Sequence, residues 1–152
     1  MCIKKNSNLY GFLLTVVSIL VFSGCAATTG HKGSEFSYLI GKASTEYEAG
    51  LLTEAEASFR KVTNLRPDFY EPWLKLGNIY VRTGQLEAAV RMYERCTELR
   101  PDDVRGWSNL SLTRLKQSLG VLDHAKQHFP AESPDAAVLR NSREALIKHL
   151  VH

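Results

Sequence analysis

The chain of 152 residues has room for a single domain. Its 19 Lys and Arg residues face 16 Asp and Glu residues, and leaving out Lys4 and Lys5 of the N-terminal segment lowers the basic count to 17. A balance this close to neutral excludes long-range attraction to nucleic acid or to an anionic membrane surface. The three cysteines lie far apart with no Cys-x-x-Cys pair, which argues against a disulfide framework and a structural zinc site.

Residues 1–24 have the three parts of a secretory signal peptide. The charged pair Lys4-Lys5 is followed by an uncharged apolar run at 9–22 and by two small residues at 23–24. This run is shorter than the roughly 20 residues that a helix needs to cross a bilayer. A cleaved signal is therefore predicted, with an uncleaved anchor helix as the alternative.

The residues V-F-S-G-C, which end at Cys25, resemble the lipobox of bacterial lipoproteins, although Phe22 stands where that family usually has Leu. The resemblance implies that Cys25 becomes the first mature residue and carries a diacylglycerol and an N-linked acyl chain such as palmitate. No other cofactor is expected. Because Ala26 and Ala27 follow the cysteine, the family's sorting rule implies the outer membrane, with the domain facing the periplasm.

The segment that follows, residues 25–35, is too poor in apolar side chains to order itself. We expect it to be a flexible tether between the lipidated cysteine and a folded domain at 36–152. A tether this short would keep the domain close to the membrane surface.

The stretch from Tyr70 to Asp103 has the pattern of a helical hairpin. Its first half places four residues on one helix face at i, i+3, i+4 and i+7: Trp73, Leu76, Gly77 and Tyr80. Its second half does so at i, i+4 and i+7: Ala89, Tyr93 and Cys96. Gly84 lies where the chain must reverse, and Leu-Arg-Pro-Asp ends the second helix. We interpret these residues, and Trp107 34 positions after Trp73, as core.

This pattern resembles one complete tetratricopeptide repeat, whose period is about 34 residues. Residues 36–69 repeat it, with Gly50, Ala55, Phe59 and the Arg-Pro-Asp of 66–68 each 34 positions earlier. Residues 104–130 begin a third repeat in which the turn slips to Gly120, with Ala125 and Phe129 in its second helix. A capping helix is expected at about 134–150, starting after Ser133 at Pro134. The predicted fold is therefore an all-α, short α-solenoid with two clear repeats, a degenerate third and a C-terminal cap.

The resemblance implies a concave groove lined mainly by the first helix of each repeat, where a partner's segment binds. The residues that point away from the packing face are the candidate contacts: Ser44, Tyr47, Glu71, Lys75, Asn78, Arg82, Arg105, Asn109, Leu112 and Lys116. A solvated charged face is the alternative interpretation. Only Arg105 matches the carboxylate clamp of the repeats that bind chaperone tails, so that specificity is not expected.

No sequence feature indicates catalysis. A nucleophile elbow, a phosphate loop and paired catalytic carboxylates are all missing from the sequence. Cys96 is interpreted as a buried, inert thiol, and His124 with His128 lacks a third metal ligand at a recognisable spacing. We therefore expect neither an enzyme nor a metal site.

The combination of anchor and repeat is similar to the small tetratricopeptide lipoproteins of type IV and Flp/Tad pilus systems. The resemblance implies a non-catalytic interaction scaffold at the outer membrane that helps to assemble an envelope machine such as a pilus or secretin complex. Its partner would be another envelope protein, with no nucleic acid and no small-molecule substrate. The alternative is an adaptor for a periplasmic enzyme of cell-wall remodelling.

Overall fold

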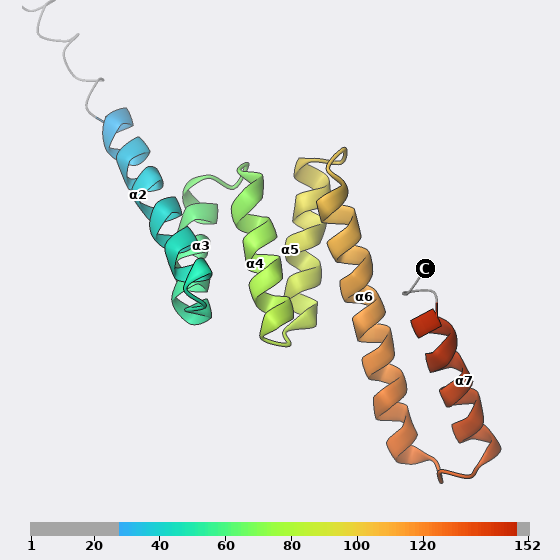
Figure 1. Ribbon diagram of the computed structural model, residues 1–152. Coiled ribbons are helices and arrows are strands. Elements are labelled where there is room, and N and C mark those ends of the chain that lie inside the picture. Colours follow the sequence, from blue (N-terminus) through green and yellow to red (C-terminus); the bar gives the residue numbers. More distant parts are fainter. Residues whose placement is uncertain (1–27, 149–152) are drawn as a thin grey trace, which may run out of the picture. The chain divides into compact units, whose positions relative to one another are not determined.

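The computed structural model of the chain describes residues 28–148. All secondary structure in this part is helical, which confirms the all-α prediction (Figure 1). The helices are α2 (Thr28–Glu48), α3 (Leu52–Leu65), α4 (Tyr70–Arg82), α5 (Leu86–Leu99), α6 (Val104–Ala125), the 3₁₀ turn η1 (Lys126–His128) and α7 (Pro134–Lys148). The chain divides into two units, residues 1–38 and 39–152, and the packing described below is that of the second. None of the helices within 28–148 is both long and apolar enough to cross a membrane.

Helices α4 and α5 form the hairpin predicted from the sequence, with a tight turn at Gly84. This glycine has φ of 76°, in the left-handed region. Glycine adopts this conformation without strain because it has no Cβ atom. The amides of Gly84 and Gln85 bind the carbonyls of Val81 (3.3 Å) and Tyr80 (2.8 Å) at the end of α4. Gly50 closes α2 in the same way, with φ of 76° and the same pair of bonds. The repeated turn is thus a property of the 34-residue period.

Gly77 allows α4 and α5 to approach each other closely. A Cβ atom added at this position would lie 2.7 Å from Cζ of Tyr93 on α5, far inside van der Waals contact. The Tyr93 ring therefore lies directly against the backbone of α4. This agrees with the prediction that the glycine is there for packing.

The hydrophobic core lies mainly on α3, α4 and α5. Its members come from every helix between α2 and α5: Ala43, Ala55, Phe59, Tyr70, Leu74, Leu76, Ile79, Tyr80, Ala89, Tyr93 and Cys96. On α6, in contrast, only Gly106 and Thr113 are buried, and on α7 only Ala136. The stabilising burial is therefore concentrated in the first two hairpins, where the sequence repeats clearly.

Trp73 on α4 and Trp107 on α6 each bind the loop that precedes their own helix. The indole N–H of Trp73 donates to the carbonyl of Pro67 at 3.1 Å, and that of Trp107 to the carbonyl of Pro101 at 2.9 Å. Trp73 also packs against the core. Trp107 is 51% exposed, so the interpretation of Trp107 as a core residue is wrong. Its indole satisfies the loop carbonyl, but half of its surface remains open to solvent.

The third hairpin differs from the prediction. Helix α6 runs without a break through Gly120, which is not among the glycines with positive φ, and the chain turns only after η1. A glycine inside a helix costs only about 1 kcal/mol, whereas a turn there would give up several backbone hydrogen bonds. The predicted third repeat at 104–130 is therefore wrong in its second half, and Phe129 is 40% exposed in the loop.

Helix α7 begins where the sequence predicted a cap. It starts at Pro134, and Ser133 caps it, since the Ser133 hydroxyl accepts a hydrogen bond from the amide of Ala136 at 3.1 Å. The helix packs on α6 and supplies the second helix of the third hairpin. The capping helix and the degenerate repeat are thus one hairpin, made of α6 and α7.

The predicted tether also needs a correction. Residues 28–35 belong to α2, so a segment expected to lack secondary structure is helical from Thr28 onward. Once a helix has formed, each added residue gains a backbone hydrogen bond without a new nucleation cost, so a helix can extend past the residues that pack. Cys25 and the predicted signal peptide lie outside the described residues.

Candidate functional site

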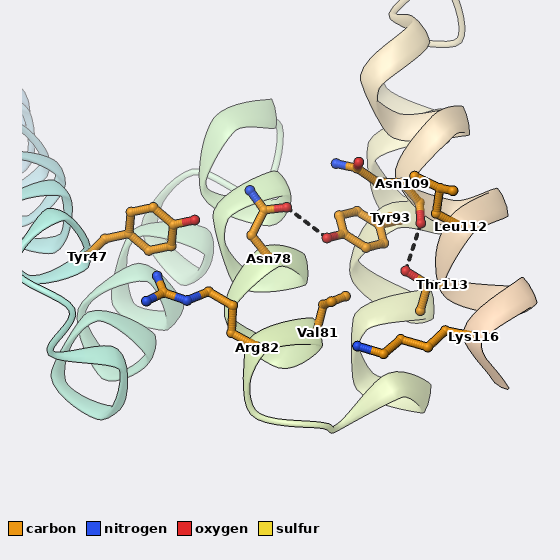
Figure 2. Close-up of a pocket in the computed structure, with 9 residues that line it drawn as sticks. All are labelled: Tyr47, Asn78, Val81, Arg82, Tyr93, Asn109, Leu112, Thr113 and Lys116. Carbon is orange, nitrogen blue, oxygen red and sulfur yellow. Dashed lines mark hydrogen bonds between the residues drawn. The ribbon is translucent and has the colours of Figure 1, made fainter. Parts of the chain in front are cut away.

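A pocket of about 370 Å³ opens on the helices that come first in each hairpin. Figure 2 shows Tyr47 of α2 on one side, three residues of α4 in the middle and four residues of α6 on the other side. Tyr93 reaches the pocket from α5. The complete lining is Tyr47, Asn78, Val81, Arg82, Tyr93, Asn109, Leu112, Thr113 and Lys116. It contains two cations, two amides and no carboxylate.

The helical period explains how α4 and α6 each contribute a row of side chains. On α4, Asn78, Val81 and Arg82 lie at i, i+3 and i+4, which is one helix face. On α6, Asn109, Leu112, Thr113 and Lys116 lie at i, i+3, i+4 and i+7, which is also one helix face. Both helices pack against α5, and Tyr93 of α5 reaches the space that the two rows share.

The ring of Tyr47 contacts both cations of α4, Lys75 and Arg82. The ammonium of Lys75 lies 4.6 Å from the centroid of the Tyr47 ring, and the guanidinium carbon of Arg82 lies 5.6 Å from it. Both distances are within the range of a cation–π contact. The ring thus positions two positive charges at one end of the pocket.

Tyr93 fixes the orientation of Asn78. Its hydroxyl donates to Oδ1 of Asn78 at 2.8 Å (Figure 2). Burial raises the pKa of Tyr93 well above its ordinary value, which keeps this donor protonated. Because the Asn78 oxygen is taken by Tyr93, the Nδ2 group, with its two N–H donors, is the part of the side chain left for a partner.

Arg105 is engaged within the chain. Its guanidinium forms ion pairs at 2.8 Å with Glu71 on α4 and at 2.8 Å with Asp103, the N-cap of its own helix. The hydrogen bond from Arg105 lowers the pKa of Asp103 to about 2, and the same bonds raise the pKa of Arg105. The charge of this arginine is therefore already neutralised by two carboxylates.

The structure separates the predicted contact residues into groups. Six of the ten line the pocket: Tyr47, Asn78, Arg82, Asn109, Leu112 and Lys116. Lys75 does not line the pocket, but its ammonium contacts the ring of Tyr47, which does. Glu71 and Arg105 form an ion pair with each other outside the pocket. Ser44 is half-buried on α2 and does not line it.

Three pocket residues were missed by the sequence analysis. Val81 and Thr113 share a helix face with predicted residues, at i+3 from Asn78 and i+4 from Asn109, so helical spacing alone would have found them. Tyr93 was assigned to the core, and its ring is buried there. It also lines the pocket from α5, and no helical spacing rule could have predicted this.

The groups with reactive or metal-binding chemistry lie elsewhere. Cys96 is fully buried, and burial raises the pKa of its thiol to about 12, so the reactive thiolate does not form near neutral pH. The Nε2 atoms of His124 and His128 are 3.5 Å apart. No group of three or more metal-binding side chains gathers anywhere in the described part of the chain.

Comparison with known families agrees with this arrangement. Residues 70–103 match the family model described as tetratricopeptide repeat. A comparison with curated proteins found no match. The matched residues are the α4–α5 hairpin together with the loop that leads into α6. The chain therefore contains a tetratricopeptide repeat at 70–103 and folds as an all-α solenoid of similar hairpins.

Proposed function

We propose that the chain is a non-catalytic protein-interaction scaffold, anchored to the outer membrane through Cys25, that helps to assemble an envelope machine such as a pilus or secretin complex. Tetratricopeptide repeats generally mediate protein–protein interaction, so the repeat at 70–103 supports the scaffold role. The membrane anchor is supported by the lipobox-like residues that precede Cys25. The pilus role is supported by the combination of such an anchor with a short repeat domain.

One observation carries the proposal: the pocket lies on the first helices of successive hairpins and presents cations and amides to solvent. The pocket has no carboxylate, thiol or imidazole among its lining residues. Hydrogen-bond donors beside the apolar side chains of Val81 and Leu112 are suited to a polypeptide. Binding of a protein segment is the function that this lining supports best.

Site-specific photo-crosslinking in cells tests the scaffold role. A photoreactive residue at Val81 or Leu112, both in the pocket, is expected to give a specific adduct with an envelope protein. The same residue at Arg91, which is exposed on α5 outside the pocket, is the matched control and should not. Equal adducts from Arg91, or none from the pocket positions, would contradict the proposal.

The identity of the adduct and the phenotype test the envelope role. For a pilus or secretin assembly factor, deletion of the chain removes the high-mass band of secretin multimers. Normal multimers, or an adduct with a cell-wall hydrolase or synthase, would reject that assignment in favour of the adaptor role. The anchor is tested separately by mass spectrometry of the N-terminal peptide and by Cys25→Ser, which should release the protein from the membrane fraction.

A further inference from the structure

Three cations along the pocket face have no carboxylate partner within the described residues. Arg60, Arg66, Arg95, Arg105, Arg114, Lys126, Arg143 and Lys42 all form ion pairs. Lys75, Arg82 and Lys116 do not appear in any ion pair of residues 28–148. Two of these three line the pocket and the third lies over Tyr47 beside it. Other cations of the described residues are also in no ion pair, but none of them lines the pocket: Lys61, Arg91, Arg100, Arg140 and Lys148. Within the pocket, Arg82 and Lys116 face no carboxylate among the lining residues.

Two of these charges lie against one aromatic ring. Lys75 and Arg82 are 4.6 and 5.6 Å from the centroid of Tyr47. A negative group of a partner placed beside this ring would be attracted by both charges. No carboxylate lines the pocket, so the pocket favours a negatively charged group of a partner.

The amides extend the same preference along the pocket. Asn78 has its oxygen bound to Tyr93, which leaves N–H donors free, and Asn109 lies across the pocket on α6 (Figure 2). Backbone carbonyls of an extended segment are the acceptors that such amides match, since a helical segment uses its carbonyls internally. Val81 and Leu112 leave room for an apolar side chain between the polar contacts.

We propose that this pocket binds an extended, acidic segment of the partner, with Arg82 and Lys116 taking its carboxylates and Asn78 taking its backbone. The inference rests on the proposed scaffold function, because it names the chemistry of the partner for the same site. It places the centre of binding at α4 and the middle of α6. Arg105 is not part of it, because Glu71 and Asp103 already neutralise that residue.

Peptide binding to the full-length mature protein in non-ionic detergent tests the proposal. The probes are short fluorescent peptides of alternating Glu and Ser, Gln and Ser, or Lys and Ser, together with a single-stranded oligonucleotide of similar length. Fluorescence anisotropy at low and at physiological ionic strength gives the affinity of each. The Glu/Ser peptide is expected to bind at least about tenfold more tightly than the Gln/Ser peptide, and this advantage should shrink with salt.

A matched pair of double variants locates the binding. Arg82→Glu with Lys116→Glu should weaken binding of the Glu/Ser peptide by about tenfold or more. Lys61→Glu with Arg91→Glu makes the same change in charge at exposed positions of α3 and α5, outside the pocket, and should change it less than about threefold. Thermal melting of both variants shows whether the fold is kept. Asn78→Ala, which leaves the charge unchanged, tests the backbone contact by itself.

Four results would overturn the proposal: equal affinity for the Gln/Ser peptide, equal loss in both double variants, no binding of the Glu/Ser peptide, or equally tight binding of the oligonucleotide. Failure here is distinguishable from failure of the scaffold function. If crosslinks from Val81 persist while the Glu/Ser peptide fails to bind, only the acidic chemistry is rejected. If the crosslinks are missing, the scaffold function itself is rejected.

Discussion

The hydroxyl of Tyr93 donates a hydrogen bond of 2.8 Å to Oδ1 of Asn78, and this bond links the hydrophobic core to the candidate binding pocket. The ring of Tyr93 is buried against Gly77, and its hydroxyl is bound to Asn78, a residue that lines the pocket. A residue of the repeat's packing pattern therefore also orients a residue of the variable face. The stability of the hairpin and the geometry of the pocket are coupled through it.

Tyr93→Phe separates these two roles. The ring and its packing are kept, so we expect the free energy of unfolding to fall by only about 0.5–1.5 kcal/mol, the net value of one hydrogen bond. Asn78 becomes free to rotate, so binding of the Glu/Ser peptide should weaken by a few fold. Chemical denaturation and anisotropy measure the two effects. An unchanged affinity would mean that the orientation of Asn78 does not matter for binding.

Gly77→Ala and Gly120→Ala should change stability in opposite directions. At Gly77 the new methyl group would overlap the ring of Tyr93, so we expect a loss of about 1–3 kcal/mol. At Gly120 an added Cβ would meet nothing within 4 Å beyond the adjacent residues and its own helix backbone. Since the backbone is helical, alanine should stabilise by about 0.5–1 kcal/mol. Thermal or urea denaturation measures both. Destabilisation by Gly120→Ala would indicate a turn at this position, as the sequence suggested.

Arg105→Gln tests whether an internally paired cation contributes to the pocket. Its ion pairs with Glu71 and Asp103 are solvent-exposed, so their loss should leave the thermal midpoint almost unchanged. Affinity for the Glu/Ser peptide should change by less than about twofold, while Arg82→Gln, the matched variant in the pocket, should lose about fivefold. Equal losses in the two variants would place Arg105 in the site.

Cys96 should resist alkylation in the folded protein. Its thiol is fully buried, with a pKa raised to about 12, so iodoacetamide at pH 8 should modify the Cys96 peptide only after unfolding, as mass spectrometry can measure. The sign of the pH effect follows from the raised pKa. Below the unfolded-state pKa of about 8.5 the thiol is protonated in both states, and stability then declines as pH rises toward 12. Rapid native-state labelling would show that Cys96 is not core.

The length of α6 shows where sequence patterns stop being sufficient. Gly84 and Gly120 look alike in the sequence, yet only Gly84 turns the chain. At Gly84 the chain reverses and α5 packs back on α4, burying Ala89 and Tyr93 in the core. After Gly120 no comparable buried face follows until α7, so the helix continues. Whether the chain turns at a glycine therefore depends on whether the residues after it can pack back on the preceding helix. The glycine by itself does not determine the turn.

The sequence by itself determined the features that arise within one helix or one hairpin. The 34-residue period, the turns at Gly50 and Gly84, the close packing at Gly77 and the helix start at Pro134 all follow from spacing and from backbone preferences that act over a few residues. Six of the pocket residues were found in the same way, because residues on one helix face recur at fixed intervals.

Only the tertiary structure decided which charges remain available for a partner. Arg82 and Arg105 were both candidate contacts in the sequence. Glu71, which is 34 residues before Arg105 and on another helix, pairs with Arg105, whereas Arg82 forms no ion pair within the described residues. The same holds for Tyr93, whose hydroxyl crosses from α5 to Asn78 on α4. Contacts between helices depend on the reach of individual side chains and on how the helices pack, and the helical period contains no information about either.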